Sequence, residues 1–230
     1  LSAGSLAAGG TLGILIPPSI AMILYGAAGE QSIPKLFVAG VLPGILLALM
    51  MSAFVVFRAV QMKVPRRGHF DLGHFLRTTV SAGPALFMPV FVLAGIYFGF
   101  ASPTEAGGFA CVYAMIVGRY IYRTMSWNDV LQAATRSAML TAQILVIVAT
   151  ASLFSWILTV SGVPQLLAAN LQALQLQAWS FLILVNVILL MVGCVLDPTS
   201  AILVLTPLLL PLAKLVGIDP IHFGIVMSMN

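Results

Sequence analysis

One stretch near the start of the chain decides its fold, and it reads Gly9-Gly10-Thr11-Leu12-Gly13-Ile14-Leu15-Ile16-Pro17-Pro18. It lies in the middle of an apolar segment, residues 6–28, that is long enough to cross a membrane as a helix. Glycine increases the backbone entropy lost on helix formation and proline removes a main-chain donor, so a continuous helix is disfavoured there. We therefore predict two half-helices with a break between Gly9 and Pro18.

A helix that breaks inside a bilayer needs a polar partner. Lipid tails cannot hydrogen-bond to free carbonyls, so an interruption at mid-depth persists only where protein, water or an ion meets the exposed backbone. Unwound carbonyls are hard oxygen ligands suited to sodium, and the N-termini of half-helices present positive dipole ends to an anionic solute. The break is therefore a candidate binding site, and the alternative is a proline kink that neighbouring helices satisfy.

The composition of the whole chain is that of a membrane protein. Of its 230 residues, 61% are hydrophobic and 7% are charged, whereas soluble domains carry about 25% charged residues. Such a chain cannot cover itself with polar surface, so lipid is the expected solvent for its exterior. The predicted fold class is an all-α, multi-pass (polytopic) membrane protein. The chain starts at Leu1 without Met or a charged leader, so we expect an internal fragment.

Basic residues gather in two linkers between apolar segments. The linkers carry, in order, Arg58, Lys63, Arg66, Arg67 and Arg77, and then Arg119, Arg123 and Arg136. The positive-inside rule predicts that both linkers are cytoplasmic. These residues do not form a stripe with interleaved aromatics, so nucleic acid is not an expected partner.

Further apolar segments predict the remaining helices. The expected spans are residues 37–57, 81–100, 104–122 and 139–159, and the amphipathic residues 163–178 suit a helix lying in the interface plane. Ser102-Pro103-Thr104-Glu105 has the pattern of a capping box, and Asp219-Pro220 has that of another helix start.

Residues 179–196 and 201–216 flank the sequence Asp197-Pro198-Thr199-Ser200, and composition leaves their topology open. They form either two full spans or a re-entrant hairpin whose tip lies at mid-depth. A deep tip makes Asp197, Thr199 and Ser200 a cluster of oxygen ligands, because a carboxylate within a bilayer must be paired or hydrated. A shallow tip makes Asp197 only an N-cap at the cytoplasmic surface.

Other candidate sites are weaker. His69, Asp71 and His74 have a spacing that suits a metal, but a solvated loop is the favoured interpretation. Cys111 and Cys194 are expected to be buried apolar side chains instead of a disulfide. The sequence contains no GxSxG, HExxH or P-loop motif, which counts against hydrolytic chemistry and ATP coupling.

Three motifs, in this order, resemble the large membrane subunit of tripartite ATP-independent periplasmic (TRAP) transporters. They are Gly10-Thr11-Leu12-Gly13-Ile14-Leu15-Ile16-Pro17-Pro18-Ser19, then Gly95-Ile96-Tyr97 leading to Pro103-Thr104-Glu105-Ala106, and then Leu196-Asp197-Pro198-Thr199 through Gly217-Ile218-Asp219-Pro220 to Phe223-Gly224-Ile225-Val226. The resemblance extends over essentially the whole chain.

The resemblance implies an elevator-type transporter with two inverted repeats, each holding a re-entrant hairpin and a broken helix. It assigns residues 1–30 to the broken helix of the first repeat, residues 31–80 to a span and a cytoplasmic linker, and residues 81–230 to the second repeat with its hairpin at about residues 179–216. It places the first hairpin before Leu1 and the break of the last helix after Asn230, so that each sodium site is half present.

The same resemblance implies sodium-coupled uptake of an organic acid across the bacterial inner membrane. It implies two partners, a periplasmic solute-binding protein and a small DctQ-like membrane subunit, and no enzymatic activity. The candidate residues for binding sodium or solute are Gly10, Thr11, Gly13, Ile16, Pro17, Asp197, Thr199 and Ser200. A C4-dicarboxylate, a sialic acid and other organic acids all remain open as the solute.

Three alternatives remain open on the sequence alone. A stand-alone sodium/dicarboxylate carrier would need no binding protein. An intramembrane enzyme would use Asp197 or His222 as an acid or base, and it would need a second catalytic group at the same depth. A membrane scaffold would transport nothing.

Overall fold

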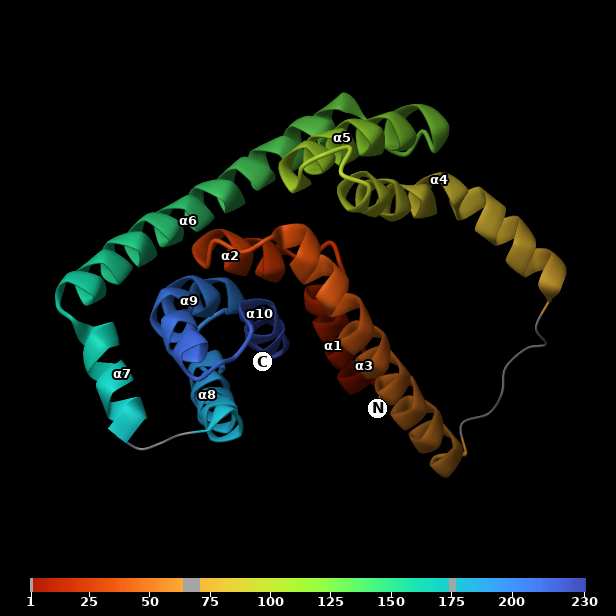
Figure 1. Cartoon of the computed structure of the whole chain (residues 1–230). Helices are drawn as coiled ribbons and strands as arrows, with labels where there is room; N and C mark the ends of the chain where they lie inside the picture. Colours follow the sequence, from red (N-terminus) through yellow and green to blue (C-terminus); the bar gives the residue numbers. More distant parts are fainter. Residues whose placement is uncertain (1, 64–70, 174–176) are drawn as a thin grey trace. The chain divides into compact units, whose positions relative to one another are not determined.

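A computed structural model describes residues 2–63, 71–173 and 177–230 of the chain. Within these ranges the secondary structure consists of α-helices and one π-helical turn, with no strand (Figure 1). The chain divides into two compact units, one formed by Leu1–Ser5 and Leu49–Ala138 and the other by Leu6–Ala48 and Met139–Asn230. The all-α prediction is therefore confirmed for the described residues.

Four helices in the described part of the chain are long and apolar enough to cross a membrane. They are α3 (Ile33–Gln61), α4 (Leu72–Tyr97), α6 (Trp127–Val160) and α9 (Pro198–Leu215). The most apolar window of α9 is 39% buried within the structure, whereas those of α3, α4 and α6 are at most 11% buried. Helix α9 is thus a central helix, and most of the surface of the other three is left for lipid or partners to cover.

The polar linkers are shorter than predicted, because several of their basic residues belong to helices. Helix α3 continues to Gln61 and α4 begins at Leu72, so Arg58 and Arg77 are helical. Helix α6 begins at Trp127, which makes Arg136 helical as well. Arginine is a good helix former, so these positions suit a continued helix.

Helix starts agree with the predicted caps. In α5 (Pro103–Ile116), the capping box of Ser102 and Glu105 is present, and the helix passes into the π-helical turn η1 (Val117–Ile121). Asp219 caps α10 (Pro220–Met229) by accepting from the main-chain N–H groups of Ile221 and His222. Both predictions are confirmed.

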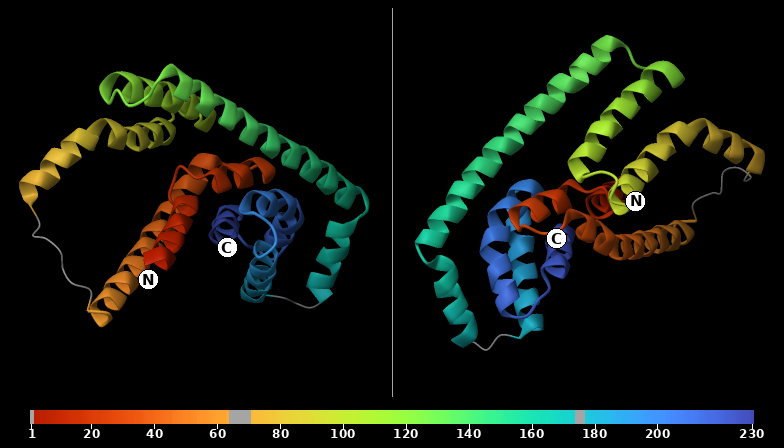
Figure 2. Two further views of the ribbon diagram at one scale, coloured as in Figure 1. Left: turned by 180° about the vertical axis from the view of Figure 1, so that it is seen from behind. Right: turned by 45° about the horizontal axis from the view of Figure 1, so that its top comes forward.

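The unit that contains the two chain segments Leu6–Ala48 and Met139–Asn230 is built around α9. Helix α9 packs against α2 (Ile20–Ala28), α7 (Val163–Ala173), α8 (Ala178–Gly193) and α10, as Figure 2 shows from two further sides. Four large side chains of this unit are fully buried, namely Tyr25, Phe37, Phe181 and Phe223. The rings of Phe181 and Phe223 have centroids 6.3 Å apart, which joins α8 to α10 through an aromatic contact.

Candidate functional site

The first broken helix is interrupted at its prolines. Helix α1 (Ser2–Leu15) ends at Leu15 and α2 begins at Ile20, so the break covers residues 16–19. The predicted break from Gly9 was therefore too long, since Gly9, Gly10 and Gly13 are all helical. A glycine in a helix costs only about 1 kcal/mol relative to alanine, whereas proline costs about 3 kcal/mol and removes a donor.

The two prolines leave main-chain carbonyls without their helical donors. In a continuous helix, the N–H groups of residues 17 and 18 would bond to the carbonyls of Gly13 and Ile14, but proline has no N–H group. The Ser19 hydroxyl donates to the Ile14 carbonyl and replaces one of these bonds. The Gly13 carbonyl has no i+4 donor, because residue 17 is a proline. Ser19 also caps α2, because its hydroxyl accepts from the N–H of Met22 at 3.4 Å.

Helix α3 holds the break in place through two glycines. A Cβ atom at Gly40 would lie 2.4 Å from Cε of Met22 and 3.0 Å from the carbonyl oxygen of Leu15. A Cβ atom at Gly44 would lie 2.9 Å from Cγ1 of Ile16. The pair, four residues apart on one face of α3, has the spacing that allows helices to approach closely in membranes.

The second element of the site is the turn between α8 and α9. Asp197 caps α9, and both of its carboxylate oxygens accept from Ser200: Oδ1 from the hydroxyl at 2.5 Å and Oδ2 from the main-chain N–H at 3.1 Å. Asp197 is exposed, whereas Thr199 and Ser200 are half-buried. The capping role of Asp197 is thereby established, and its role as an ion ligand stays a prediction.

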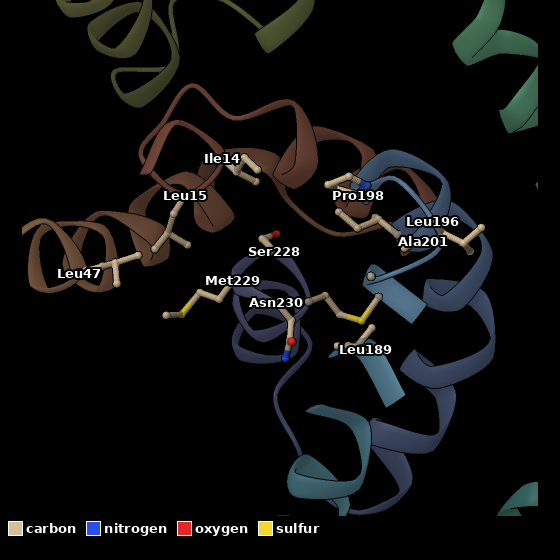
Figure 3. Close-up of a pocket in the computed structure, with 13 residues that line it drawn as sticks. Ile14, Leu15, Leu47, Leu189, Leu196, Pro198, Ala201, Ser228, Met229 and Asn230 are labelled. Carbon is tan, nitrogen blue, oxygen red and sulfur yellow. The ribbon is translucent and has the colours of Figure 1, made fainter. Parts of the chain in front are cut away.

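These two elements border one cavity of about 230 Å³ (Figure 3). The end of α1 contributes Ile14 and Leu15, the hairpin turn contributes Leu196 and Pro198, and the end of α10 and its C-cap contribute Ser228 and Asn230. The other lining residues come from α3, α8, α9 and α10, and they are apolar. A mostly apolar cavity with a few polar groups at helix ends is a common form of small-molecule site.

The predicted residues that the structure describes do not line the cavity, but several of them are next in sequence to residues that do. In the sequence, Gly13 precedes and Ile16 follows the lining residues Ile14 and Leu15. Asp197 precedes and Thr199 follows the lining residue Pro198. Gly10, Pro17 and Ser200 are also absent from the lining, and the side chain of Thr11 lies outside the described structure. The structure thus brings the two predicted segments together through their immediate neighbours.

Sequence reasoning missed an amide pair beside this cavity. Asn230 donates from its side chain to Oδ1 of Asn186, and Asn186 donates to the Leu182 carbonyl at 2.7 Å. Ser228 of the cavity donates to the Gly224 carbonyl at 2.8 Å. The signal for Asn186 was present in the sequence, because it is an amide in the middle of an otherwise strongly apolar helix.

The weaker candidates gain no support. No group of three or more His, Cys, Asp and Glu side chains that could hold a metal ion occurs in the described part of the chain. Asp71 is the N-cap of α4, and His69 lies outside the described residues. Cys111 and Cys194 are unpaired, but the prediction that they are buried was wrong, because both are exposed on the surface of the structure.

A helix broken at paired prolines, a capped turn between two apolar helices and a shared cavity define a multi-pass membrane protein of the transporter class. Residues 1–230 match the family described as the DctM component of the tripartite ATP-independent periplasmic transporter, and the chain belongs to this family. It belongs to a family of transport components and not to a family of enzymes.

Several curated relatives are similar over the whole chain. The C4-dicarboxylate TRAP transporter large permease protein DctM of Pseudomonas aeruginosa is 41% identical over 99% of this chain and 53% of its own length. The isethionate TRAP transporter permease protein DctMQ of Oleidesulfovibrio alaskensis is 36% identical over 100% of this chain and 36% of its own length. The sialic acid TRAP transporter large permease protein SiaM of Vibrio cholerae is 33% identical over 99% of this chain and 53% of its own length. The chain spans about half the length of most of these relatives.

Proposed function

We propose that the complete protein is the large permease of a TRAP transporter that couples sodium entry to the uptake of an organic acid. The observation that carries this proposal is the meeting of the broken helix and the hairpin turn at one cavity. Irregular backbone at membrane depth is tolerated where it lines a cavity that holds an ion or solute. Two irregular segments, far apart in the sequence, border the same cavity here, which supports this proposal.

The chemistry of the break supports a cation as the coupling ligand. The carbonyl of Gly13 lacks its helical donor, and carbonyl oxygens are the ligands that hard cations prefer. At the hairpin turn, Asp197, Thr199 and Ser200 add oxygens that complete such a set. The N-termini of α2 and α9 begin at these two segments, and their positive dipole ends favour an anionic solute nearby.

The names of the relatives support an organic acid as the solute and further subunits as partners. They name C4-dicarboxylate, isethionate and sialic acid, which are all organic acids. A large permease implies a smaller membrane subunit, which the name DctMQ places in one chain with it. We infer a DctQ-like subunit and a periplasmic solute-binding protein as partners, with the hairpin and broken helices moving as one unit in an elevator mechanism.

The test is uptake by the complete transporter in proteoliposomes. A panel of radiolabelled organic acids is offered with and without the binding protein, in sodium or in choline. We expect uptake only when both sodium and the binding protein are present. Uptake that is unchanged in choline would refute the coupling, and uptake without the binding protein would identify a stand-alone carrier instead.

A further inference from the structure

A second hollow, of about 740 Å³, lies in the unit that does not contain the cavity described above. Two segments of the chain contribute polar side chains to its walls. Helix α4 contributes His74, Arg77 and Ser81, and the segment after η1 contributes Tyr122 and Thr124. The proposed transport function does not use these residues, so the hollow needs an explanation of its own.

Hydrogen bonds fix the wall of this hollow in place. The Tyr122 hydroxyl donates to the Ser81 carbonyl at 3.0 Å and accepts from the N–H of Ala85 at 3.3 Å. The carbonyl of Gly118 accepts from the N–H groups of Thr124 and Met125, at 3.1 and 3.3 Å. The segment after η1 is thereby attached both to α4 and to its own preceding turn. These bonds hold the two walls of the hollow together.

The guanidinium of Arg77, at the hollow, has no counterion among the residues that the structure describes. The side chain of Arg77 forms no hydrogen bond or ion pair with any residue in the described ranges. The three acids of this unit, Asp71, Glu105 and Asp129, all accept hydrogen bonds at the starts of helices. The neighbouring residues 64–70 contain two arginines and no acid. An anion from outside the chain is therefore the natural partner of the Arg77 guanidinium.

The surroundings of the hollow indicate which anion this is. Helix α4 follows the basic linker that the positive-inside rule assigns to the cytoplasmic face. Beside the hollow, the same helix exposes Leu72, Leu76 and Val80, whose side chains are 59%, 54% and 77% exposed. A ligand that covers both surfaces must carry an anionic group and apolar chains. Arginine pairs with phosphate through two parallel hydrogen bonds, and basic pockets on the cytoplasmic side of membrane proteins suit lipid head groups.

We propose that this hollow binds the phosphate of an anionic phospholipid from the cytoplasmic leaflet, with Arg77 as the main ligand. His74 and the hydroxyl of Thr124 supply further donors from the two walls. The acyl chains lie along Leu72, Leu76 and Val80 of α4. Because the hollow and the transport cavity belong to different units, the lipid site and the transport proposal can fail separately.

The experiment uses the complete transporter, purified and stripped of lipid in detergent. The midpoint of its thermal unfolding is measured at increasing concentrations of phosphatidylglycerol, phosphatidylcholine or inorganic phosphate. Native mass spectrometry counts the lipids that the folded protein retains. We expect phosphatidylglycerol to raise the midpoint more than phosphatidylcholine does. Arg77→Gln should raise the phosphatidylglycerol concentration that gives half of this midpoint shift by roughly tenfold, since the variant lacks a charge-assisted hydrogen bond to the phosphate. Arg136→Gln is the matched control, because Arg136 is exposed on α6 and does not line the hollow.

Three results would overturn the proposal. Equal responses of Arg77→Gln and Arg136→Gln would show that no phosphate binds at Arg77. An equal midpoint shift with inorganic phosphate would show a site for a free anion and not for a lipid. Protection that requires the small subunit and no lipid would assign the hollow to a protein partner.

Discussion

The hydroxyl of Tyr25 donates a hydrogen bond of 2.6 Å to the carbonyl of Pro220, which joins the second half of the broken helix to the start of α10. Tyr25 is fully buried, and its ring fills the space above Gly224, where a Cβ atom would lie 2.3 Å from Cε1 of the ring. The two segments are almost the whole chain apart in sequence. This contact therefore fixes the broken helix relative to the helix that lines the far side of the cavity.

Tyr25→Phe tests that contact, because it removes the hydroxyl and keeps the ring. We expect a loss of stability of about 0.5 to 1.5 kcal/mol, the usual net value of one hydrogen bond. Thermal unfolding of the complete protein in detergent measures it. Tyr120→Phe is the matched control, since that side chain is 65% exposed and its hydroxyl forms no bond with the described residues. Equal midpoints for the two variants would contradict the contact.

Gly40→Ala tests the packing of α3 against the break. The added methyl group would lie 3.0 Å from the carbonyl oxygen of Leu15, so main chain as well as the Met22 side chain must shift. We expect destabilisation of about 1 to 3 kcal/mol, as for other overpacked sites, and reduced uptake. Gly83→Ala, where no atom lies within 4 Å of the new Cβ, should lower neither, and it should raise stability by up to about 1 kcal/mol because alanine is the better helix former. Normal stability and uptake in Gly40→Ala would show that α3 does not hold the break.

Asp197→Asn separates the two roles of the hairpin carboxylate. Asparagine caps helices about as well as aspartate, so we expect stability to change by less than about 0.5 kcal/mol. If the carboxylate also binds the coupling ion, the sodium concentration for half-maximal uptake should rise by roughly tenfold, which corresponds to 1.4 kcal/mol. Asp129→Asn, at the start of α6, serves as the matched control. An unchanged sodium dependence would leave Asp197 with its capping role alone.

Thr206→Val tests a buried hydroxyl without a partner. Thr206 is fully buried in α9, and its Oγ1 atom forms no hydrogen bond within the described structure. An unpaired buried hydroxyl costs about 1 to 3 kcal/mol, so replacing it by a methyl group should raise the thermal midpoint. Thr206→Ser keeps the hydroxyl and should not raise it. A lower midpoint in Thr206→Val would mean that the hydroxyl has a partner in the complete protein.

Local chemistry made many helix ends predictable from the sequence. Ser102 and Asp219 mark the starts of α5 and α10 because a side-chain oxygen there satisfies free N–H groups. The break at Pro17 was equally predictable, since proline cannot donate. The extent of the break was not, because a glycine such as Gly13 fits a helix at small cost, and its neighbours decide whether the helix continues.

The cavity itself could be predicted only in part. The sequence pointed to both irregular segments, but the residues that line the cavity depend on how helices pack over long separations. Asn186 and Asn230 meet across two helices, and no local pattern specifies that pairing. The exposure of Cys111 could not be predicted for the same reason, because the sequence of an apolar segment does not reveal which of its faces meets protein and which meets lipid.

The most direct test of the account asks whether the cavity between α1 and the hairpin turn holds the solute. In the complete transporter, with every native cysteine, Cys111 and Cys194 among them, replaced by serine, Ser228→Cys places one thiol in the cavity wall, and its labelling rate by a small thiol reagent is measured. We predict that sodium together with a transported organic acid slows this labelling, whereas a protein that retains only Cys111 is labelled at the same rate in either condition. Equal labelling of the Ser228→Cys thiol with and without sodium and solute would contradict the account.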